Sequence, residues 1–390
     1  FEYKLKNKKK SISNKEKVIL PFPLLSLIDR PELHKNNAEQ YSGNISKNNQ
    51  NFKQNKIQIK NKIKIAYFSA RFYNCATLHN MLDVFKNHNK NDFEIYAFNY
   101  GKIDSWTKKI NKYFNKFFEV ANLSLEEILK LGKQNDIHVA VDLTGYTKNA
   151  RNEIFLNQIA PIQINFLGYP GTLGSKMYDY ILADKIVIPK EFEKYYSEKV
   201  LRLPNCYLPT QANQKISSKN FTKQDFGLPT NKFIFGCFNN SYKITPKIFD
   251  CWMKILKSSQ DSVLWLLQDN KLGQDNLKKE ARLRGVDPER ILFANRIPVE
   301  DHLKRIGLID LFLDTFPYNA HTTAREAIKM KVPVITIIGE SFVSRVAGSL
   351  LSNIGLEKLI VNNFEEYIET ATMIASNIKK FKEIKMHLKQ

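Results

Sequence analysis

Strand-like and helix-like segments alternate along most of this chain. Short apolar runs such as 62–69 (KIKIAYFS), 138–143 (HVAVDL) and 262–267 (SVLWLL) have the length and composition of buried strands. Between them lie longer segments whose apolar residues recur at helical spacing. Parallel strands need a crossover connection, usually a helix, so the alternation predicts an α/β fold with parallel sheets wrapped by helices.

A polar stretch divides this alternation into two series. Residues 209–226 are rich in Ser, Asn, Gln and Lys. We therefore expect two tandem Rossmann-like domains, at 61–215 and 216–390, that face each other across a cleft. Ligands of such domains bind beyond the carboxyl ends of the strands.

Residues 1–60 are expected to form an N-terminal arm, a helix and a linker. The first 17 residues are Lys-rich and typical of a solvated arm, and the Asn/Lys/Gln-rich residues 42–60 predict a flexible linker. Between them, 18–28 should dock in extended or turn form, because two prolines interrupt its apolar run. Residues 29–41 then predict a helix with Asp29 as its N-cap.

Three helices are predicted early in the first domain. Residues 105–118 and 150–159 have helical spacing, and 124–135 adds a capping box made by Ser124 and Glu127. These helices would connect consecutive strands of the sheet.

Composition excludes several classes of protein. The net charge of +21 comes from lysines spread along the whole chain, which does not favour a nucleic-acid-binding patch. Four scattered cysteines without a CxxC pair fit a reducing, cytoplasmic location. No apolar run approaches the ~20 residues that cross a bilayer, so no membrane association is expected.

Cofactor and metal motifs are also missing from the sequence. No Asp-x-Asp pair and no His/Cys pair with ligand spacing occurs, so we expect no metal. No GxxxxGK[ST] occurs, and no GxGxxG follows the first strand of either domain. Neither a P-loop ATPase nor a dinucleotide dehydrogenase is favoured, and no cofactor is expected.

The most suggestive site lies after the apolar run 308–313. A turn containing Pro317 follows this run, and His321, Thr322 and Thr323 then open a helix-like segment. Free N–H groups and the positive end of a helix dipole make such a position an anion site, and the two hydroxyls add donors. The alternative is that Thr322 or Thr323 is only an N-cap.

Further candidates follow other strands. Lys243 comes just after the strand at 233–238, where it is either a point charge for a phosphate or an ordinary solvated lysine. The glycine loops at 145–147 and 168–174 allow a ligand to approach the backbone, or are ordinary turns.

Polar side chains elsewhere leave two interpretations each. His302 and Arg305 lie one helical turn apart. They could contact a base or phosphate, or they could be a surface pair. His79 is catalytic or structural. Asp142, at the end of a buried strand, orients a neighbour or caps a turn.

Taken together, these motifs resemble the catalytic region of the protein O-GlcNAc transferases, particularly their bacterial relatives. The resemblance covers roughly residues 18–380. The matching stretches are Pro21–Tyr41, Gly145–Phe155, Ala160–Gln163, Leu167–Gly174, Tyr196–Leu203, Phe238–Ile244, Ser262–Leu267, Leu313–Thr323 and Gly339–Gly348.

The resemblance implies the two-Rossmann arrangement called GT-B, with an acceptor and sugar side in the first domain and a nucleotide-sugar site in the second. It implies inverting, metal-independent transfer of GlcNAc from UDP-GlcNAc to Ser or Thr hydroxyls of proteins or peptides. By resemblance, Lys243 would hold the diphosphate, and His321, Thr322 and Thr323 would contact the phosphates. The remaining implied site residues are Asn240, Ile297, His302 and Arg305 in the nucleotide pocket, Glu326 on the ribose, and Thr147 and Gly171 facing sugar and acceptor.

The chain departs from the family pattern in the loop after the first strand. The family usually has an Asp-Phe pair followed closely by a His, and here Arg71 replaces the acid and Cys75 the His, while His79 is kept. The ribose acid is Glu326 where Asp is usual. The helix-repeat domain that normally presents acceptors is not seen. Two alternatives stay open: a GDP-fucose-dependent SPINDLY-type O-fucosyltransferase, and a non-catalytic nucleotide-sugar-binding module.

Overall fold

The protein is described by a computed structural model that covers residue 11, residues 18–46 and residues 61–389. The chain divides into two compact units. Unit 1 contains the described residues up to Leu25 and Arg30–Ala212, and unit 2 contains Ser26–Asp29 and the described residues from Asn213 onward.

Unit 1 is built on a sheet of seven strands in the order β3-β2-β1-β4-β5-β6-β7, all parallel. The strands are β1 Ile63–Ser69, β2 Phe93–Asn99, β3 Lys116–Glu119, β4 Val139–Asp142, β5 Ile162–Asn165, β6 Tyr180–Ala183 and β7 Lys199–Arg202. The α-helices of this unit are α2 Pro21–Leu25, α3 Pro31–Ser46, α4 Ala76–Lys86, α5 Ser105–Ile110, α6 Leu125–Gln134 and α7 Glu153–Leu156.

The core of unit 1 lies around β1, an inner strand that pairs with β2 on one side and β4 on the other. Phe68 of β1 pairs in register with Phe98 of β2, and their rings stack at 4.4 Å between centroids. Helices cover a parallel sheet on both faces, which explains why such strands are apolar throughout rather than alternating.

Unit 2 has a sheet of six strands in the order β10-β9-β8-β11-β12-β13, again all parallel. The strands are β8 Phe233–Cys237, β9 Ser262–Leu267, β10 Ile291–Ala294, β11 Leu311–Leu313, β12 Val334–Ile337 and β13 Ile360–Val361. The α-helices are α8 Pro246–Ser258, α9 Lys271–Leu283, α10 Val299–Ile306, α11 Thr322–Lys329, α12 Val346–Ser352, α13 Phe364–Ser376 and α14 Ile378–His387.

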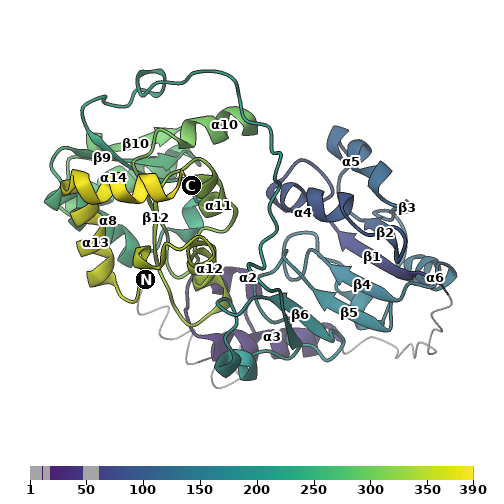
Figure 1. Ribbon diagram of the computed structural model, residues 1–390. Coiled ribbons are helices and arrows are strands. Elements are labelled where there is room, and N and C mark those ends of the chain that lie inside the picture. Colours follow the sequence, from purple (N-terminus) through teal and green to yellow (C-terminus); the bar gives the residue numbers. More distant parts are fainter. Residues whose placement is uncertain (1–10, 12–17, 47–60, 390) are drawn as a thin grey trace. The chain divides into compact units, whose positions relative to one another are not determined.

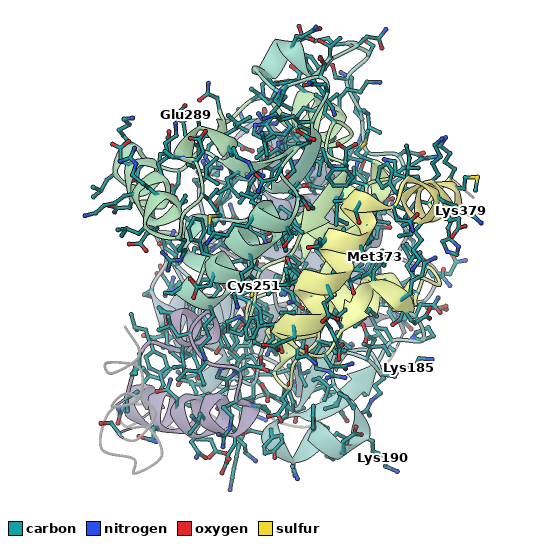
Figure 2. All side chains as sticks on the ribbon, turned by 90° about the vertical axis from the view of Figure 1, so that its left-hand side faces the viewer. Lys185, Lys190, Cys251, Glu289, Met373 and Lys379 are labelled. Carbon is teal, nitrogen blue, oxygen red and sulfur yellow. The ribbon has the colours of Figure 1, made fainter. Side chains whose placement is uncertain are left out.

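Helices form a layer on each side of the unit 2 sheet. In Figure 1, α11 and α12 lie on the opposite side of β12 from α8 and α13. Figure 2 shows the outer face on which α8, carrying Cys251, packs beside α13, carrying Met373. The predicted fold of two tandem Rossmann-like domains is therefore confirmed in each unit.

The strand order determines where a ligand can bind in each unit. The order reverses between β1 and β4 in unit 1 and between β8 and β11 in unit 2. At such a switch point the loops after the two central strands diverge to opposite faces of the sheet and leave a crevice at their carboxyl ends. The loops after β8 and β11 contain Lys243 and His321, so both candidate anion-binding loops of unit 2 flank its switch point.

The N-terminal segment folds differently from the expectation. Residues 21–25 form a short helix, because Pro21 and Pro23 both fall in its first turn, where a missing N–H leaves no hydrogen bond unmade. Helix α3 extends to Ser46, into the predicted linker. The predicted arm at 1–17, except residue 11, and the rest of the linker at 47–60 lie outside the described residues.

The sequence position of Asp29 suggests a helix N-cap, but Asp29 does not have this role in the structure. Its carboxylate instead accepts hydrogen bonds from the backbone N–H groups of Glu340 and Ser341, both at 2.9 Å. It also accepts from the hydroxyls of Ser341 at 2.6 Å and Ser344 at 2.7 Å. Four donors from a distant loop outcompete a local cap, and no spacing rule within the sequence reveals them.

The predicted helix at 105–118 was wrong in its second half. Helix α5 ends at Ile110, and residues 116–119 form the edge strand β3. Phe117 contacts the ring of Phe72, whereas its neighbour Phe118 contacts Phe98. Successive aromatic rings that meet different partners follow the two-residue period of a strand, which outweighs the helical spacing of the sequence. The helix predicted at 150–159 is reduced to α7, whereas α6 and its capping box are confirmed.

We expect Asp29→Ala to lower the free energy of unfolding by about 2 kcal/mol, because hydrogen bonds to a charged group are lost and two backbone donors are left to water. Urea denaturation followed by circular dichroism measures the change. Glu32→Ala is the matched control: this carboxylate forms an exposed ion pair with Arg30, at 3.5 Å, and its loss should cost less than about 0.5 kcal/mol. Equal effects of the two substitutions would contradict the role of Asp29.

Candidate active site

Lys243 is buried at the carboxyl end of β8. It closes a single 3-10 turn, Ser241–Lys243, before α8 starts at Pro246. Only 8% of the residue is exposed. Its Nζ donates a hydrogen bond to the carbonyl oxygen of Asn319 at 2.8 Å and lies 3.9 Å from the centre of the Tyr318 ring. The interpretation of Lys243 as a solvated surface lysine is therefore wrong.

Burial also changes the acidity of Lys243. Loss of water around the ammonium lowers the pKa of Lys243 below the ordinary lysine range, while the negative charge of Asp314 opposes that shift. A desolvated cation interacts more strongly with an incoming anion than an exposed one does. Lys243 is therefore a buried cation of the kind that suits a phosphate.

Asp314, the first residue after β11, organises the turn that faces Lys243. Its Oδ1 accepts hydrogen bonds from the backbone N–H of Thr315 at 2.7 Å and of Ala320 at 2.6 Å. Its Oδ2 accepts from the hydroxyl of Thr336, on the neighbouring strand β12, at 2.7 Å. Burial raises the pKa of the Asp314 carboxyl above its usual range, and these donors and Lys243 oppose the rise.

The amino end of α11 begins where this turn ends. His321 is the N-cap residue, and its side chain makes no capping hydrogen bond. Thr322 and Thr323 are the first two residues of the helix, so neither is the N-cap. The first N–H groups of a helix have no partner within it, and they point with the positive end of its dipole toward a bound anion.

Asn239 connects the loop after β8 with α11. Its amide Nδ2 donates to the hydroxyl of Thr315 at 2.8 Å, and its Oδ1 accepts from the hydroxyl of Thr323. Asn239 is 4% exposed, whereas its neighbour Asn240, the predicted nucleotide contact, is exposed. The two candidate loops of unit 2 are therefore held together by a buried amide.

His321 lies against the same turn. Its ring is 5.1 Å from that of Tyr318, and its Nε2 is 3.4 Å from the carbonyl oxygen of Val343. Burial, together with the nearby Lys243 charge, lowers the pKa of His321 well below the ordinary histidine value. The imidazole is therefore neutral at physiological pH, so it contributes a hydrogen bond rather than a charge.

Glu326 follows one turn later on α11. It is largely buried and 3.7 Å from the guanidinium of Arg325. Burial raises the pKa of Glu326 to about 7, although Arg325 and Lys329 oppose the rise. A carboxylate in this state accepts hydrogen bonds readily, which suits the vicinal hydroxyls of a ribose.

The buried Arg305 and the half-buried His302 pair on α10. Arg305 is 1% exposed, and its guanidinium lies 5.1 Å from the centre of the Phe238 ring. Its Nε donates to Nδ1 of His302 at 3.0 Å, and Nη1 donates to the carbonyl oxygen of Asn295. Arg305 thus positions His302, while Ile297 lies half-buried in the loop before α10.

His302 is consequently held in one tautomer. Burial and the neighbouring Arg305 and Arg296 charges lower the pKa of His302 to about 3. Because Nδ1 of the neutral ring accepts a hydrogen bond, the proton must lie on Nε2. The ring packs 5.2 Å from Phe238, next to Asn239 in the loop after β8, and so presents an N–H donor near that loop.

In unit 1 the loop after β1 carries two candidate residues. Cys75 is the N-cap residue of α4, and its Sγ lies 3.5 Å from the carbonyl oxygen of Arg71. Burial raises the pKa of the Cys75 thiol, so the thiol stays protonated at neutral pH. His79 is buried one turn later, with Nε2 2.7 Å from Oδ1 of Asn74 and its ring 4.8 Å from that of Trp106.

Arg71 connects this loop with the one after β4. Its Nη2 donates to the hydroxyl of Thr147 at 3.4 Å, and the same hydroxyl donates to the carbonyl oxygen of Thr144 at 2.9 Å. The loops after β1 and β4 therefore meet at the switch point of unit 1. Asp142 both caps and orients: it accepts from Thr144 N–H at 2.8 Å and from Tyr178 OH at 2.8 Å.

Gly171 lies in the loop after β5. A Cβ atom at this position would come within 3.1 Å of the Tyr169 ring, closer than nearly all such contacts. The Tyr169 ring is in turn 5.5 Å from that of Tyr146, the neighbour of Thr147. Gly171 is buried, and it is linked to Thr147 through two tyrosine rings.

Sequence reasoning missed the residues that support the site. Asp314, Asn239, Asn319 and Tyr318 were not selected, although all four are buried around Lys243 and α11. Asp314 could have been selected from the sequence by analogy with Asp142, because both are acidic residues at the end of a buried strand. The others became visible only through contacts between loops about 75 residues apart.

We expect the His302 ring to remain neutral, with its proton on Nε2, from about pH 8 down to about pH 5. Long-range ¹⁵N–¹H NMR correlations report the tautomer and the charge, and the spectrum of His302→Asn assigns the signals. A ring that titrates near the ordinary histidine pKa would contradict the hydrogen bond from Arg305.

Comparison with known proteins identifies relatives along nearly the whole chain. The family described as Glycosyl transferase family 41 matches residues 34–218 and 210–390. A probable UDP-N-acetylglucosamine–peptide N-acetylglucosaminyltransferase, SEC, of Arabidopsis thaliana is 38% identical over 84% of this chain and 34% of its own length. The Caenorhabditis elegans UDP-N-acetylglucosamine–peptide N-acetylglucosaminyltransferase is 26% identical over 82% of this chain and 38% of its own.

Solved structures agree with these relatives. A mutant O-GlcNAc transferase of Thermobaculum terrenum superposes with a TM-score of 0.85 at 25% identity, covering 94% of this chain and 70% of that one. WaaG, a glycosyltransferase of lipopolysaccharide biosynthesis, shares only the fold, at a TM-score of 0.52 and 12% identity. The predicted GT-B fold is thereby confirmed.

The chain spans only about a third of the length of these curated relatives, 34% and 38%. Within the described part, no helix is both long and apolar enough to cross a membrane. The family match spans both units, and the relatives agree with the resemblance noted from the motifs. The chain therefore belongs to Glycosyl transferase family 41.

Proposed function

We propose that this chain is the catalytic part of a protein O-GlcNAc transferase. It would transfer GlcNAc from UDP-GlcNAc to Ser or Thr hydroxyls of proteins, with inversion at the sugar and without a metal ion. The observation that carries the proposal is the buried Lys243 ammonium beside the amino end of α11, at the switch point of unit 2. Such a pair suits a diphosphate.

The residues of unit 2 divide the donor between them. Lys243 and the first N–H groups of α11 would hold the diphosphate, with hydroxyls from Thr322 and Thr323. Glu326 would accept hydrogen bonds from the ribose. The neutral His302 ring would offer its Nε2–H to the nucleotide, while Ile297 and Asn240 would border the base.

The main catalytic requirement of this reaction is stabilisation of the leaving group. As the acceptor hydroxyl oxygen bonds to the anomeric carbon, the bond to the β-phosphate oxygen breaks, and the hydroxyl proton passes to a base. Negative charge then grows on the departing UDP. Preorganised donors at the position of that charge lower the barrier, because they need no rearrangement during the reaction. Lys243 and α11 would supply this stabilisation, and no covalent enzyme intermediate is required.

Unit 1 would serve the sugar and the acceptor. Thr147 and the backbone at Gly171 border loops at the carboxyl edge of its sheet, as do Cys75 and His79. The protonated Cys75 thiol is a poor base. We therefore propose that a cysteine at this position lowers the rate of transfer.

The choice of donor rests on the relatives. SEC of Arabidopsis thaliana is 38% identical, whereas SPINDLY of the same plant is 27% identical over the same share of this chain, 84%. Both proteins are named as probable UDP-N-acetylglucosamine–peptide N-acetylglucosaminyltransferases, which supports UDP-GlcNAc as the donor. The four cysteines are free thiols, which supports the proposal of a reducing, cytoplasmic location.

Calorimetric titration with UDP-GlcNAc, UDP and GDP-fucose tests the donor, and an assay with a Ser/Thr-containing peptide tests transfer. Binding of UDP and UDP-GlcNAc, followed by transfer or slow sugar release, is the expected result. Selective binding of GDP-fucose would show that the donor is GDP-fucose rather than UDP-GlcNAc. Binding of UDP-GlcNAc with neither transfer nor hydrolysis would make the chain a non-catalytic module.

We expect Lys243→Met to lower kcat at least about 100-fold, because a donor to the leaving diphosphate is lost. Steady-state kinetics with the peptide measure the loss. Circular dichroism must accompany them, since the substitution leaves Asp314 buried without its cation. Lys254→Met, on the exposed face of α8, is the matched control and should keep full activity. Full activity of Lys243→Met would remove this residue from the mechanism.

We expect Cys75→His to raise kcat, by about tenfold or more, because an imidazole titrates near neutral pH and the buried thiol does not. The gain should follow the pH at which the new imidazole loses its proton. Cys75→Ala separates this effect from simple loss of the thiol and should leave kcat unchanged. An unchanged or lower rate in Cys75→His would show that the departure from the family pattern is not a loss.

A further inference from the structure

One carboxylate links both anion-binding loops of unit 2. The backbone N–H of Ala320, which Asp314 binds at 2.6 Å, belongs to the peptide whose carbonyl is that of Asn319. That carbonyl accepts the Lys243 ammonium at 2.8 Å. The next residue, His321, is the N-cap of α11. The single hydrogen bond that Asp314 accepts from Ala320 N–H therefore fixes both the partner of Lys243 and the start of the helix.

Asp314 is itself held rigidly from behind. Its Oδ2 accepts from the Thr336 hydroxyl at 2.7 Å, and its backbone oxygen accepts from Tyr367 OH at 2.8 Å. The Tyr367 hydroxyl in turn accepts from the indole N–H of Trp252 at 3.3 Å. The side chain is 1% exposed, so no solvent competes for these bonds.

We propose that Asp314 is a positioning residue for transfer: it holds the 315–320 turn against the Lys243 ammonium and supplies the negative charge that keeps this amine protonated. The inference rests on the proposed function, because it concerns the same diphosphate site. It assigns no contact between Asp314 and the substrate. The carboxylate acts through Lys243 and through the first turn of α11.

The charges around Lys243 support this role. Asp314 favours the ammonium, whereas burial opposes it. Burial keeps the nearby Cys237 thiol and His321 ring uncharged near neutral pH, so neither adds a charge there. The Tyr318 ring presents its π face to the cation. Around Asp314 the titratable neighbours are Lys243, Cys237 and Tyr367. Among these, the carboxyl of Asp314, with its pKa raised by burial to about 7, is the group that becomes negatively charged around neutral pH and is then opposite in charge to the ammonium.

The sign of the pH dependence follows. Lys243 binds a diphosphate as a cation, so affinity falls as pH rises through the pKa of Lys243. Removing the negative charge of Asp314 lowers that pKa further, because a nearby opposite charge favours the ammonium. The loss of affinity should then begin at lower pH. A purely structural role would instead weaken binding by the same factor at every pH.

Asp314→Asn tests this with little change of shape, since the amide oxygen still accepts from Thr315 and Ala320. The dissociation constant of UDP is measured from about pH 6 to about pH 9. We expect affinity within about threefold of the unmodified protein at the acid end and a midpoint lower by about one pH unit or more. Asp310→Asn, at the opposite end of β11, removes an equal charge and should leave the midpoint unchanged.

A second readout keeps the inference separate from the proposed donor. NMR of the ¹³Cε signals of labelled lysines, assigned with Lys243→Arg, reports the pKa of Lys243 without any ligand. A lower pKa of Lys243 in Asp314→Asn supports the inference even if UDP does not bind, in which case only the proposed function fails. An unchanged pKa of Lys243, or a uniform loss of UDP affinity with an unchanged midpoint, overturns it.

Thr336→Val carries the test if Asp314→Asn does not fold. This substitution keeps the carboxylate but removes the hydroxyl that stabilises its charged form, at nearly constant volume. Asp314 should then be neutral over more of the pH range, and the pKa of Lys243 should shift in the same direction by a smaller amount. No shift in a folded Thr336→Val protein would overturn the inference.

Discussion

Burying the ammonium of Lys243 is the constraint on which the rest of unit 2 depends. Taking such a charge out of water costs several kcal/mol unless close partners replace the water. Here the carbonyl of Asn319, the face of the Tyr318 ring and the charge of Asp314 do so. Each lies on the turn after β11, so that turn must keep one conformation, and the helix that follows begins in one place.

The fold could be predicted from the sequence because it follows from local patterns. Alternating apolar runs and helical spacing predict parallel strands with crossover helices, and the strand order of both sheets is typical of that plan. Predictions failed where distant contacts decide the local structure. Phe117 and Phe118 belong to an edge strand because their rings contact different partners, Phe72 and Phe98. Asp29 binds a loop more than 300 residues away.

The candidate site was predictable only in its outer parts. Residues that follow strands, such as Lys243 and His321, are visible from spacing, because ligands bind at strand ends. The residues that make them effective are not. Asn239 is buried and joins two loops, whereas its neighbour Asn240 is exposed, and Arg305 positions His302 from within an aromatic cluster. Such roles depend on burial, which a single sequence does not specify.

The attachment of Asp29 also determines the order in which the protein can be completed. Unit 2 is not one continuous piece of chain, because Ser26–Asp29 belongs to it while the residues on either side belong to unit 1. During synthesis Glu340 and Ser341 are made 311 and 312 residues after Asp29. Residues 30–212 of unit 1 can therefore fold before the loop that binds Asp29 has been made. Unit 2 is therefore completed by joining a segment made before residues 30–212 of unit 1 to the chain made after them.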